Sequence, residues 1–159
     1  MAVSGAEKLR LNFDDRLIIS NRADVEMSLM ADRHYSRRTI GSAQFTGPGT
    51  DLVLRNAEAT VLFVWVWHNK AGEQLQRWDK QTGYCCSLFR NESPRLASDI
   101  ILEAESIAIE EWGPNRAYTY IDPAKIQRSR TPGRCFLKAG WKRIGESKGG
   151  LILLEKDLA

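Results

Sequence analysis

The stretch from Thr119 to Trp141 constrains the fold of this chain more than any other. It joins a short β-like run, a basic loop and a compact apolar segment. Proline is tolerated at the first helical position, where the N–H has no intrahelical partner, and glycine just past a helix can take the left-handed conformation that closes it. Pro132 and Gly140 therefore predict a short helix from Pro132 to Ala139.

A longer amphipathic helix is predicted directly before this stretch. Its apolar residues recur at helical spacing and its acidic residues fall on the opposite side. The apolar face carries Leu96, Ile100, Ala104, Ile107, Ala108 and Trp112, opposite Asp99, Glu103, Glu105 and Glu110. Gly113-Pro114 ends this helix, and residues 117–121 follow as a strand. A strand, a helix and a strand in this order predict a crossover connection in the middle of the chain.

The remaining elements are shorter. Residues 1–16 are predicted to be a tail or a weak first strand, residues 17–20 form a strand, and Asp24 caps a helix whose core face carries Val25, Leu29 and Met30. Further strands are predicted at 51–55, 60–68, 84–92, 141–144 and 151–154, with the first two and the last two paired as hairpins. This order predicts one α/β domain over residues 1–159, with a mixed, mostly antiparallel central sheet and helices on both faces.

Composition excludes a membrane-spanning or disulfide-stabilised chain. Spanning helices need about 18 or more apolar residues, whereas the run from Thr60 to Trp67 stops at eight. Cys85 and Cys86 are adjacent and point to opposite faces of a strand, while Cys135 lies in the second helix, so reduced thiols are expected. With no signal pattern at the N-terminus, we expect a soluble cytoplasmic protein without a membrane partner.

This element order resembles the C-terminal half of the GNAT acetyltransferases. The resemblance implies their fold. In that family, backbone N–H groups of a glycine-bearing loop between the fourth strand and the long helix hold the pyrophosphate of acetyl-CoA. Here the connection from Arg90 to Ser98 has no glycine, and it contains a proline and a glutamate. The sequence therefore disfavours acetyl-CoA as the cofactor.

Five separated patches resemble the Mom family of DNA-modification proteins, known from bacteriophage Mu, in register over about residues 15–155. They are residues 31–36 (ADRHYS), 47–54 with GPG and LVL, 89–92 (FRNE), 118–122 (YTYID) and 135–141 (CFLKAGW). This resemblance implies a phage-type enzyme that converts the exocyclic N6 of adenine in double-stranded DNA to a carbamoylmethyl form. The modification protects DNA from host restriction enzymes.

The patches contain side chains suited to such chemistry. We predict four catalytic residues, His34, Tyr35, Arg90 and Asp122, and four substrate-binding residues, Ser36, Asn91, Glu92 and Tyr120. Adenine N6 is a poor nucleophile, so a base or charge stabiliser must act near it, and histidine suits proton transfer at neutral pH. Tyrosine can stack on an extruded base, and arginine can hold an anion. The alternatives are a solvated histidine at a helix end, a core tyrosine, a surface ion pair at Arg90 and a turn opened by Asp122.

Two basic clusters suggest contact with DNA phosphates. The predicted DNA-binding residues are Arg33, Arg37 and Arg38 in one cluster and Lys125, Arg128 and Arg130 in the other. A solvated basic surface is the alternative, because the net charge is only +3. A base-modifying enzyme must extrude its target, so we expect the adenine to enter a pocket between the patches. Trp65, Trp67 and Trp78 are expected in the core.

The sequence does not identify the donor of the transferred group. Acyl transfer would leave an amide on N6, whereas the Mom product carries a methylene there, so acetyl-CoA alone does not account for it. The resemblance also implies iron, with His34 as a candidate ligand, although only His68 offers a second imidazole and no metal-binding spacing is present. Two further alternatives are a conventional acetyl-CoA-dependent N-acetyltransferase and a non-catalytic DNA-binding module. The partners expected are double-stranded DNA and an unidentified small-molecule donor, and a homodimer is left open.

Overall fold

A central sheet organises the molecule. The computed structural model describes residues 16–37, 39–42, 44–126 and 130–159, and in this part of the chain a seven-stranded sheet has the order β1-β2-β3-β6-β7-β9-β8. Its strands are β1 (Ile18–Ile19), β2 (Thr50–Arg55), β3 (Val61–Trp67), β6 (Tyr84–Asn91), β7 (Asn115–Ile121), β8 (Lys142–Glu146) and β9 (Ile152–Leu158). β4 (Asn69–Lys70) and β5 (Glu73–Gln74) form a separate two-stranded sheet. Among the described strands, only β6 and β7 pair in parallel, so the predicted mixed, mostly antiparallel sheet is confirmed.

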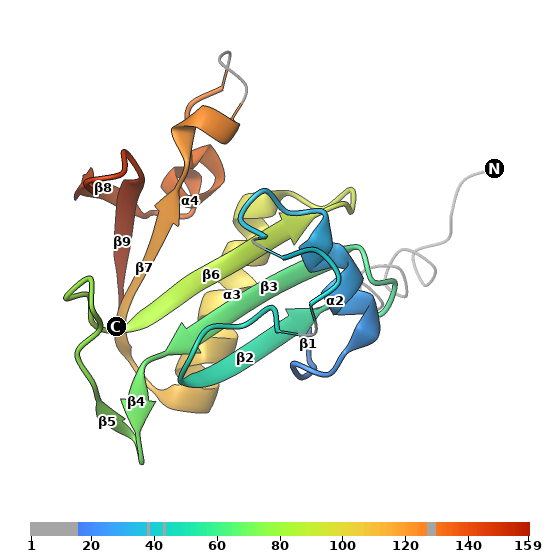
Figure 1. Cartoon of the computed structure of the whole chain (residues 1–159), viewed down its shortest axis with the longest axis horizontal. Helices are drawn as coiled ribbons and strands as arrows, with labels where there is room; N and C mark the ends of the chain where they lie inside the picture. Colours follow the sequence, from blue (N-terminus) through green and yellow to red (C-terminus); the bar gives the residue numbers. More distant parts are fainter. Residues whose placement is uncertain (1–15, 38, 43, 127–129) are drawn as a thin grey trace, which may run out of the picture.

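Helices cover both faces of this sheet (Figure 1). They are α2 (Val25–Asp32), α3 (Ala97–Trp112), α4 (Arg134–Lys138) and a 3-10 turn, η1 (Pro123–Lys125). One apolar cluster joins α2 to β3 and includes Met27 and Val64. The other joins α3 and α4 to the opposite face and includes Ile100, Trp65 and Phe136. No helix in the described ranges is long and apolar enough to cross a membrane.

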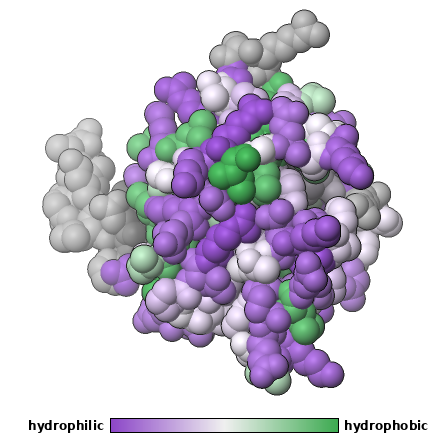
Figure 2. All heavy atoms as spheres, turned by 90° about the vertical axis from the view of Figure 1, so that its left-hand side faces the viewer, coloured by the Kyte–Doolittle hydropathy of each residue, from purple (hydrophilic) through white to green (hydrophobic). Residues whose placement is uncertain are grey.

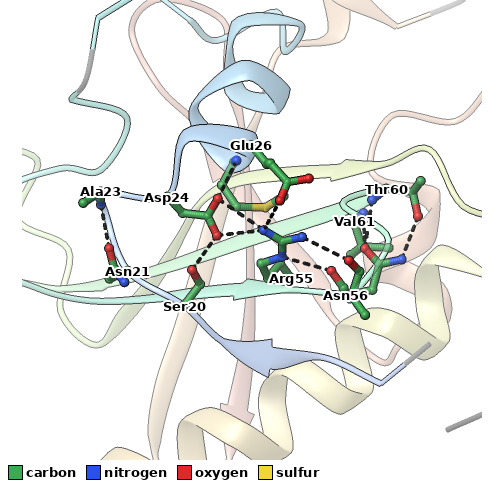
Figure 3. Close-up of polar contacts among 11 residues, drawn as sticks. Ser20, Asn21, Ala23, Asp24, Glu26, Arg55, Asn56, Thr60 and Val61 are labelled. Carbon is green, nitrogen blue, oxygen red and sulfur yellow. Dashed lines mark hydrogen bonds and ion pairs between the residues drawn. The ribbon is translucent and has the colours of Figure 1, made fainter. Parts of the chain in front are cut away.

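A polar network fixes α2 on the sheet (Figure 3). The Asp24 side chain accepts the Met27 N–H at 3.1 Å, as a helix cap does, and also pairs with Arg55 at 2.9 Å. Burial raises the pKa of Asp24, but hydrogen bonds from Ser20, Arg55 and the Met27 N–H outweigh it and lower this pKa. The cap predicted at Asp24 is therefore confirmed, and with the Arg55 pair it fixes the start of α2 on the sheet.

The predicted core face of α2 is partly wrong. Val25 and Leu29 are 71% and 55% exposed, whereas Met27, Met30 and Ala31 are buried. The ion pair between Asp24 and Arg55 accounts for the difference, because it fixes the rotation of the helix about its axis. Eight residues of mixed polarity do not encode that rotation themselves.

The helix predicted from Pro132 begins at Arg134. Gly133 precedes it with a φ of +71°, a left-handed conformation that interrupts any helix begun at Pro132. A Cβ at Gly133 would lie 2.7 Å from Cδ1 of Leu154, so this glycine also permits close packing on β9. The predicted end is confirmed, because Gly140 follows the helix with a φ of +93°.

The sheet opens between its two parallel strands. β6 pairs with β7 only from Tyr84 to Cys86, opposite Ala117 to Thr119. Beyond that point β6 continues to Asn91, while β7 stays paired with β9 as far as Ile121, so the two strands diverge (Figure 1). Unpaired strand edges in the middle of a sheet leave room for a ligand, and this divergence positions the candidate site.

Candidate active site

A cavity of about 650 Å³ lies at the opening between β6 and β7. Most of its lining comes from five places: the end of α2 (His34, Tyr35, Ser36), β6 (Cys85–Phe89), β7 and the residue after it (Thr119–Asp122), α4 (Cys135, Phe136) and the loop after β5 (Arg77, Trp78). The rest comes from Gly47, Pro48, Val66, His68, Ile126, Gly133 and Leu151. Five of the predicted site residues therefore meet at one cavity: His34, Tyr35, Ser36, Tyr120 and Asp122. Arg90, Asn91 and Glu92 are not among its lining residues.

His34 is held as a neutral ring. Its Nδ1 accepts the backbone N–H of Ser36 at 3.1 Å and lies 2.7 Å from the Ser36 hydroxyl. Because a nitrogen that accepts an N–H carries no proton, the neutral ring has its proton on Nε2. Burial and the nearby charge of Arg90 lower the pKa of His34 to about 4. A hydrogen bond to the Phe89 backbone raises this pKa, but its effect is smaller. His34 thus positions Ser36 and is a poor acceptor for a further proton.

We expect His34 to remain neutral across the physiological range. Its folded pKa of about 4 lies below the value of 6.5 for a free imidazole. The stability that this difference provides is complete above 6.5 and is lost as the pH falls toward 4. NMR of the imidazole protons, assigned with His34→Gln, should show no titration of His34 between about pH 5.5 and 8. An inflection near neutrality would contradict this assignment.

Tyr35 is placed to contact a flat substrate. Its ring stacks on that of His34 with centroids 4.3 Å apart, and its side chain remains 42% exposed. Burial raises the pKa of its hydroxyl, although a hydrogen bond from the backbone of Asp122 acts in the opposite direction. The phenol therefore stays protonated and can donate a hydrogen bond inside the cavity.

Among the described residues that line the cavity, Asp122 is the one carboxylate. One of its oxygens accepts the Ala124 N–H at 3.0 Å and thereby caps η1. This cap fixes the side chain where β7 ends, beside the opening of the sheet. A fixed carboxylate at this position can accept a proton from a substrate amine.

Arg90 and Glu92 form a brace outside the cavity lining. Glu92 receives hydrogen bonds from Arg33 at 2.9 and 3.0 Å and from Arg90, which lower its pKa to about 2. Arg90 also donates to the Arg33 carbonyl at 2.7 Å. These contacts tie the end of α2 to the end of β6. They give Arg90 a positioning role for His34, and the catalytic role predicted for Arg90 stays a prediction.

Asn91 stabilises the connection to α3. Its side chain donates to the Arg95 carbonyl at 2.8 Å and accepts the Ser93 N–H at 2.9 Å. The Glu92 N–H donates to Thr60 O at 2.7 Å, Pro94 has no N–H, and the Arg95 N–H donates to the Ser93 hydroxyl at 3.2 Å. Residues 92 to 95 therefore present no free N–H to a pyrophosphate group.

The predicted DNA-binding residues differ in their exposure to solvent. Lys125 and Arg130 are exposed, and Lys125 precedes the cavity residue Ile126. Arg37 is different, because its side chain is only 6% exposed and its guanidinium hydrogen-bonds Asp32 and the carbonyls of Ser42 and Gln44. This arginine serves the fold rather than a phosphate. Arg38 and Arg128 lie outside the described residues.

Sequence reasoning missed several cavity residues. Cys86 and Cys135 line it, and burial raises the pKa of both thiols, which makes them apolar walls rather than nucleophiles. The Thr119 hydroxyl donates to the Cys86 carbonyl at 2.8 Å, where the strands begin to separate. Trp78, expected in the core, is 87% exposed and lines the cavity. No sequence signal marks these positions, because the divergence of two strands is a tertiary feature.

The described residues do not supply a fitting iron site. His34, the implied ligand, is already engaged by Ser36 through Nδ1 and by the backbone of Phe89. Among the residues that the structure places, no three His, Cys, Asp or Glu side chains are grouped to hold an ion.

Comparisons with known proteins address the fold. No family model and no curated protein matches the sequence. An aminoglycoside acetyltransferase, AAC(6')-Ib, in complex with coenzyme A is similar to this chain with a TM-score of 0.56 and 14% identity, over 89% of this chain and 94% of that one. The chain has the GNAT acetyltransferase fold. The same enzyme in complex with coenzyme A and kanamycin gives a TM-score of 0.57 at the same identity and coverage. At this identity the likeness establishes the fold alone, and the resemblance to the Mom family stays a prediction.

Proposed function

We propose that this GNAT-fold chain is a group transferase acting on the exocyclic N6 of adenine in duplex DNA, which it converts to the carbamoylmethyl form. One observation carries the proposal. Two sequence patches about ninety residues apart, ending in Ser36 and Asp122, meet at the cavity where β6 and β7 separate. Both patches belong to the resemblance that implies this reaction.

The cavity has groups for each part of the transfer. As N6 forms a bond to the methylene carbon of the donor, the bond from that carbon to its leaving group breaks, and the nitrogen becomes strongly acidic. Asp122 accepts one proton from this nitrogen, which leaves a secondary amine on the base and a released leaving group. Tyr35 provides a flat face and a hydroxyl donor beside it. His34 fixes Ser36 and stays neutral.

A coenzyme A-dependent N-acetyltransferase is the second candidate. The comparisons favour it, because both similar structures are acetyltransferase complexes with coenzyme A. Against it stands the connection before α3: residues 92 to 95 have no free N–H for the pyrophosphate, so only the first N–H groups of α3 are left to hold it.

Restriction resistance tests the proposal. Plasmid DNA from cells that express the chain should resist restriction enzymes whose sites contain adenine, while DNA from cells with an empty vector is cut. In parallel, the melting temperature of the purified protein should rise with duplex DNA and not with coenzyme A. Full cleavage together with stabilisation by coenzyme A would replace the first candidate with the second.

A further inference from the structure

Trp78 has an unusual environment for a tryptophan. Its side chain is 87% exposed, whereas Trp65 and Trp141 are 0% and 3% exposed. Tryptophan is highly buried on average in folded proteins, because its large apolar ring gains most by leaving water. Trp78 nevertheless lines the cavity, which places its indole at the cavity mouth.

The turn that carries Trp78 is braced against β7. The Lys80 N–H donates to the Arg77 carbonyl at 2.9 Å, and Lys80 has a φ of +63°, an uncommon conformation for a residue other than glycine. Asp79 accepts the Gln81 N–H at 3.1 Å and the Tyr120 hydroxyl at 3.2 Å. The indole is thus presented on a preordered turn, and strained backbone of this kind clusters at ligand-binding positions.

A second brace joins the same loop to the sheet. Arg116 on β7 donates to the Thr82 carbonyl and to the Gln81 side chain, both at 2.9 Å. Because Tyr120 also belongs to β7, the loop and one wall of the cavity are held by the same strand. The position of Trp78 relative to Asp122, the residue after β7, is therefore fixed by the fold.

The surroundings of Trp78 match a nucleic acid better than an apolar partner. The loop after β5 lies at the left of Figure 1 and faces the viewer in Figure 2, where the surface is mostly hydrophilic. Arg77 lines the cavity next to Trp78, but its guanidinium pairs with Asp79 at 3.3 Å and lies over the Tyr118 ring, so its charge is already neutralised. The exposed Lys80 forms no ion pair within the described ranges, which leaves its charge available beside the indole. An exposed aromatic ring close to an available lysine suits a flat base attached to a phosphate.

We propose that Trp78 is the stacking platform on which the extruded adenine enters the cavity. This inference rests on the proposed function and adds the residue that recognises the base. The indole contacts one face of the adenine at the mouth, while the neighbouring Lys80 neutralises a phosphate. Stacking selects a flat ring and not a particular base edge.

Acrylamide quenching and duplex binding test this role. Exposed Trp78 should dominate the quenchable fluorescence, so Trp78→Phe should remove most of it. A duplex that carries adenine opposite an abasic site eases extrusion of the base, and it should shield the wild-type fluorescence from acrylamide.

Trp78→Ala should weaken binding of this duplex by about tenfold or more, because stacking of one base is lost. Trp78→Phe should restore most of the affinity, and Leu102→Ala, an exposed apolar position on α3, serves as the surface control.

The outcomes separate the two proposals. Shielding of Trp78, loss of affinity in Trp78→Ala and rescue by Trp78→Phe support the platform. If the wild type binds the duplex but Trp78 stays quenchable, or if Trp78→Ala binds as tightly as the wild type, the platform is refuted and the proposed function stands. If the folded wild type binds no duplex, both proposals fail.

Discussion

Replacing Asp122 with asparagine is expected to lower the yield of modified adenine by about 100-fold or more, the contribution of a positioned general base. In the part of the cavity lining that the structure describes, Asp122 is the one carboxylate, and Nδ1 of His34 already accepts the Ser36 N–H. An amide cannot accept the proton that N6 must lose. Adduct counts in DNA from expressing cells measure the effect.

Asp122→Asn is also a conservative change for the fold. The amide oxygen can still accept the Ala124 N–H that Asp122 accepts at 3.0 Å, so η1 keeps its cap. The melting temperature should therefore stay close to that of the wild type. Asp157→Asn, an exposed aspartate on β9, controls for the loss of one negative charge. Modification at the wild-type level in Asp122→Asn would remove this carboxylate from the mechanism.

Replacing Lys156 with methionine is expected to destabilise the protein by about 3 kcal/mol, the cost of leaving a buried charge without its partner. Lys156 lies 2.6 Å from Glu105, whose side chain is only 7% exposed. It also donates to the Ala139 carbonyl at 2.7 Å, while Trp141 donates to Glu105 at 3.2 Å. These contacts join α3, the end of α4 and the C-terminal hairpin. Denaturant unfolding measures the loss.

A double variant separates the charge from the packing. Glu105→Gln removes the charge and keeps an acceptor for Trp141, so Lys156→Met combined with Glu105→Gln should be more stable than Lys156→Met alone. Arg143→Met is the matched control, because Arg143 and Glu146 form an ion pair that is 52% and 55% exposed. Its loss should cost less than about 1 kcal/mol. Equal destabilisation by Lys156→Met and Arg143→Met would contradict the buried role of Glu105.

Local patterns predicted most of the fold. The 3.6-residue period of α3, the alternation and turns of the hairpins, and the cap at Asp24 are all written in neighbouring residues. Local patterns do not determine which of two similar faces of a helix becomes buried. Glu105 was placed on the exposed face of α3 but is buried, because Lys156 and Trp141 arrive from the far end of the chain to satisfy it.

The candidate site was predictable only in part. The sequence patches identified His34, Tyr35 and Asp122, and the structure brings all three to one cavity. Arg90 and Glu92 belong to the same patches, yet they pair with Arg33 outside the cavity lining. Trp78 lies in a polar loop that has no periodic pattern. Its place beside the cavity follows from the divergence of β6 from β7, which the sequence does not reveal.

Nucleoside mass spectrometry of DNA from expressing cells tests the central claim most directly. The proposed function predicts a deoxyadenosine heavier by the carbamoylmethyl group in cells with the wild-type chain, and its loss in cells that express Asp122→Asn at the same level. Unmodified deoxyadenosine in DNA from cells with abundant, folded wild-type protein would contradict the claim and leave the coenzyme A-dependent acetyltransferase as the candidate to pursue.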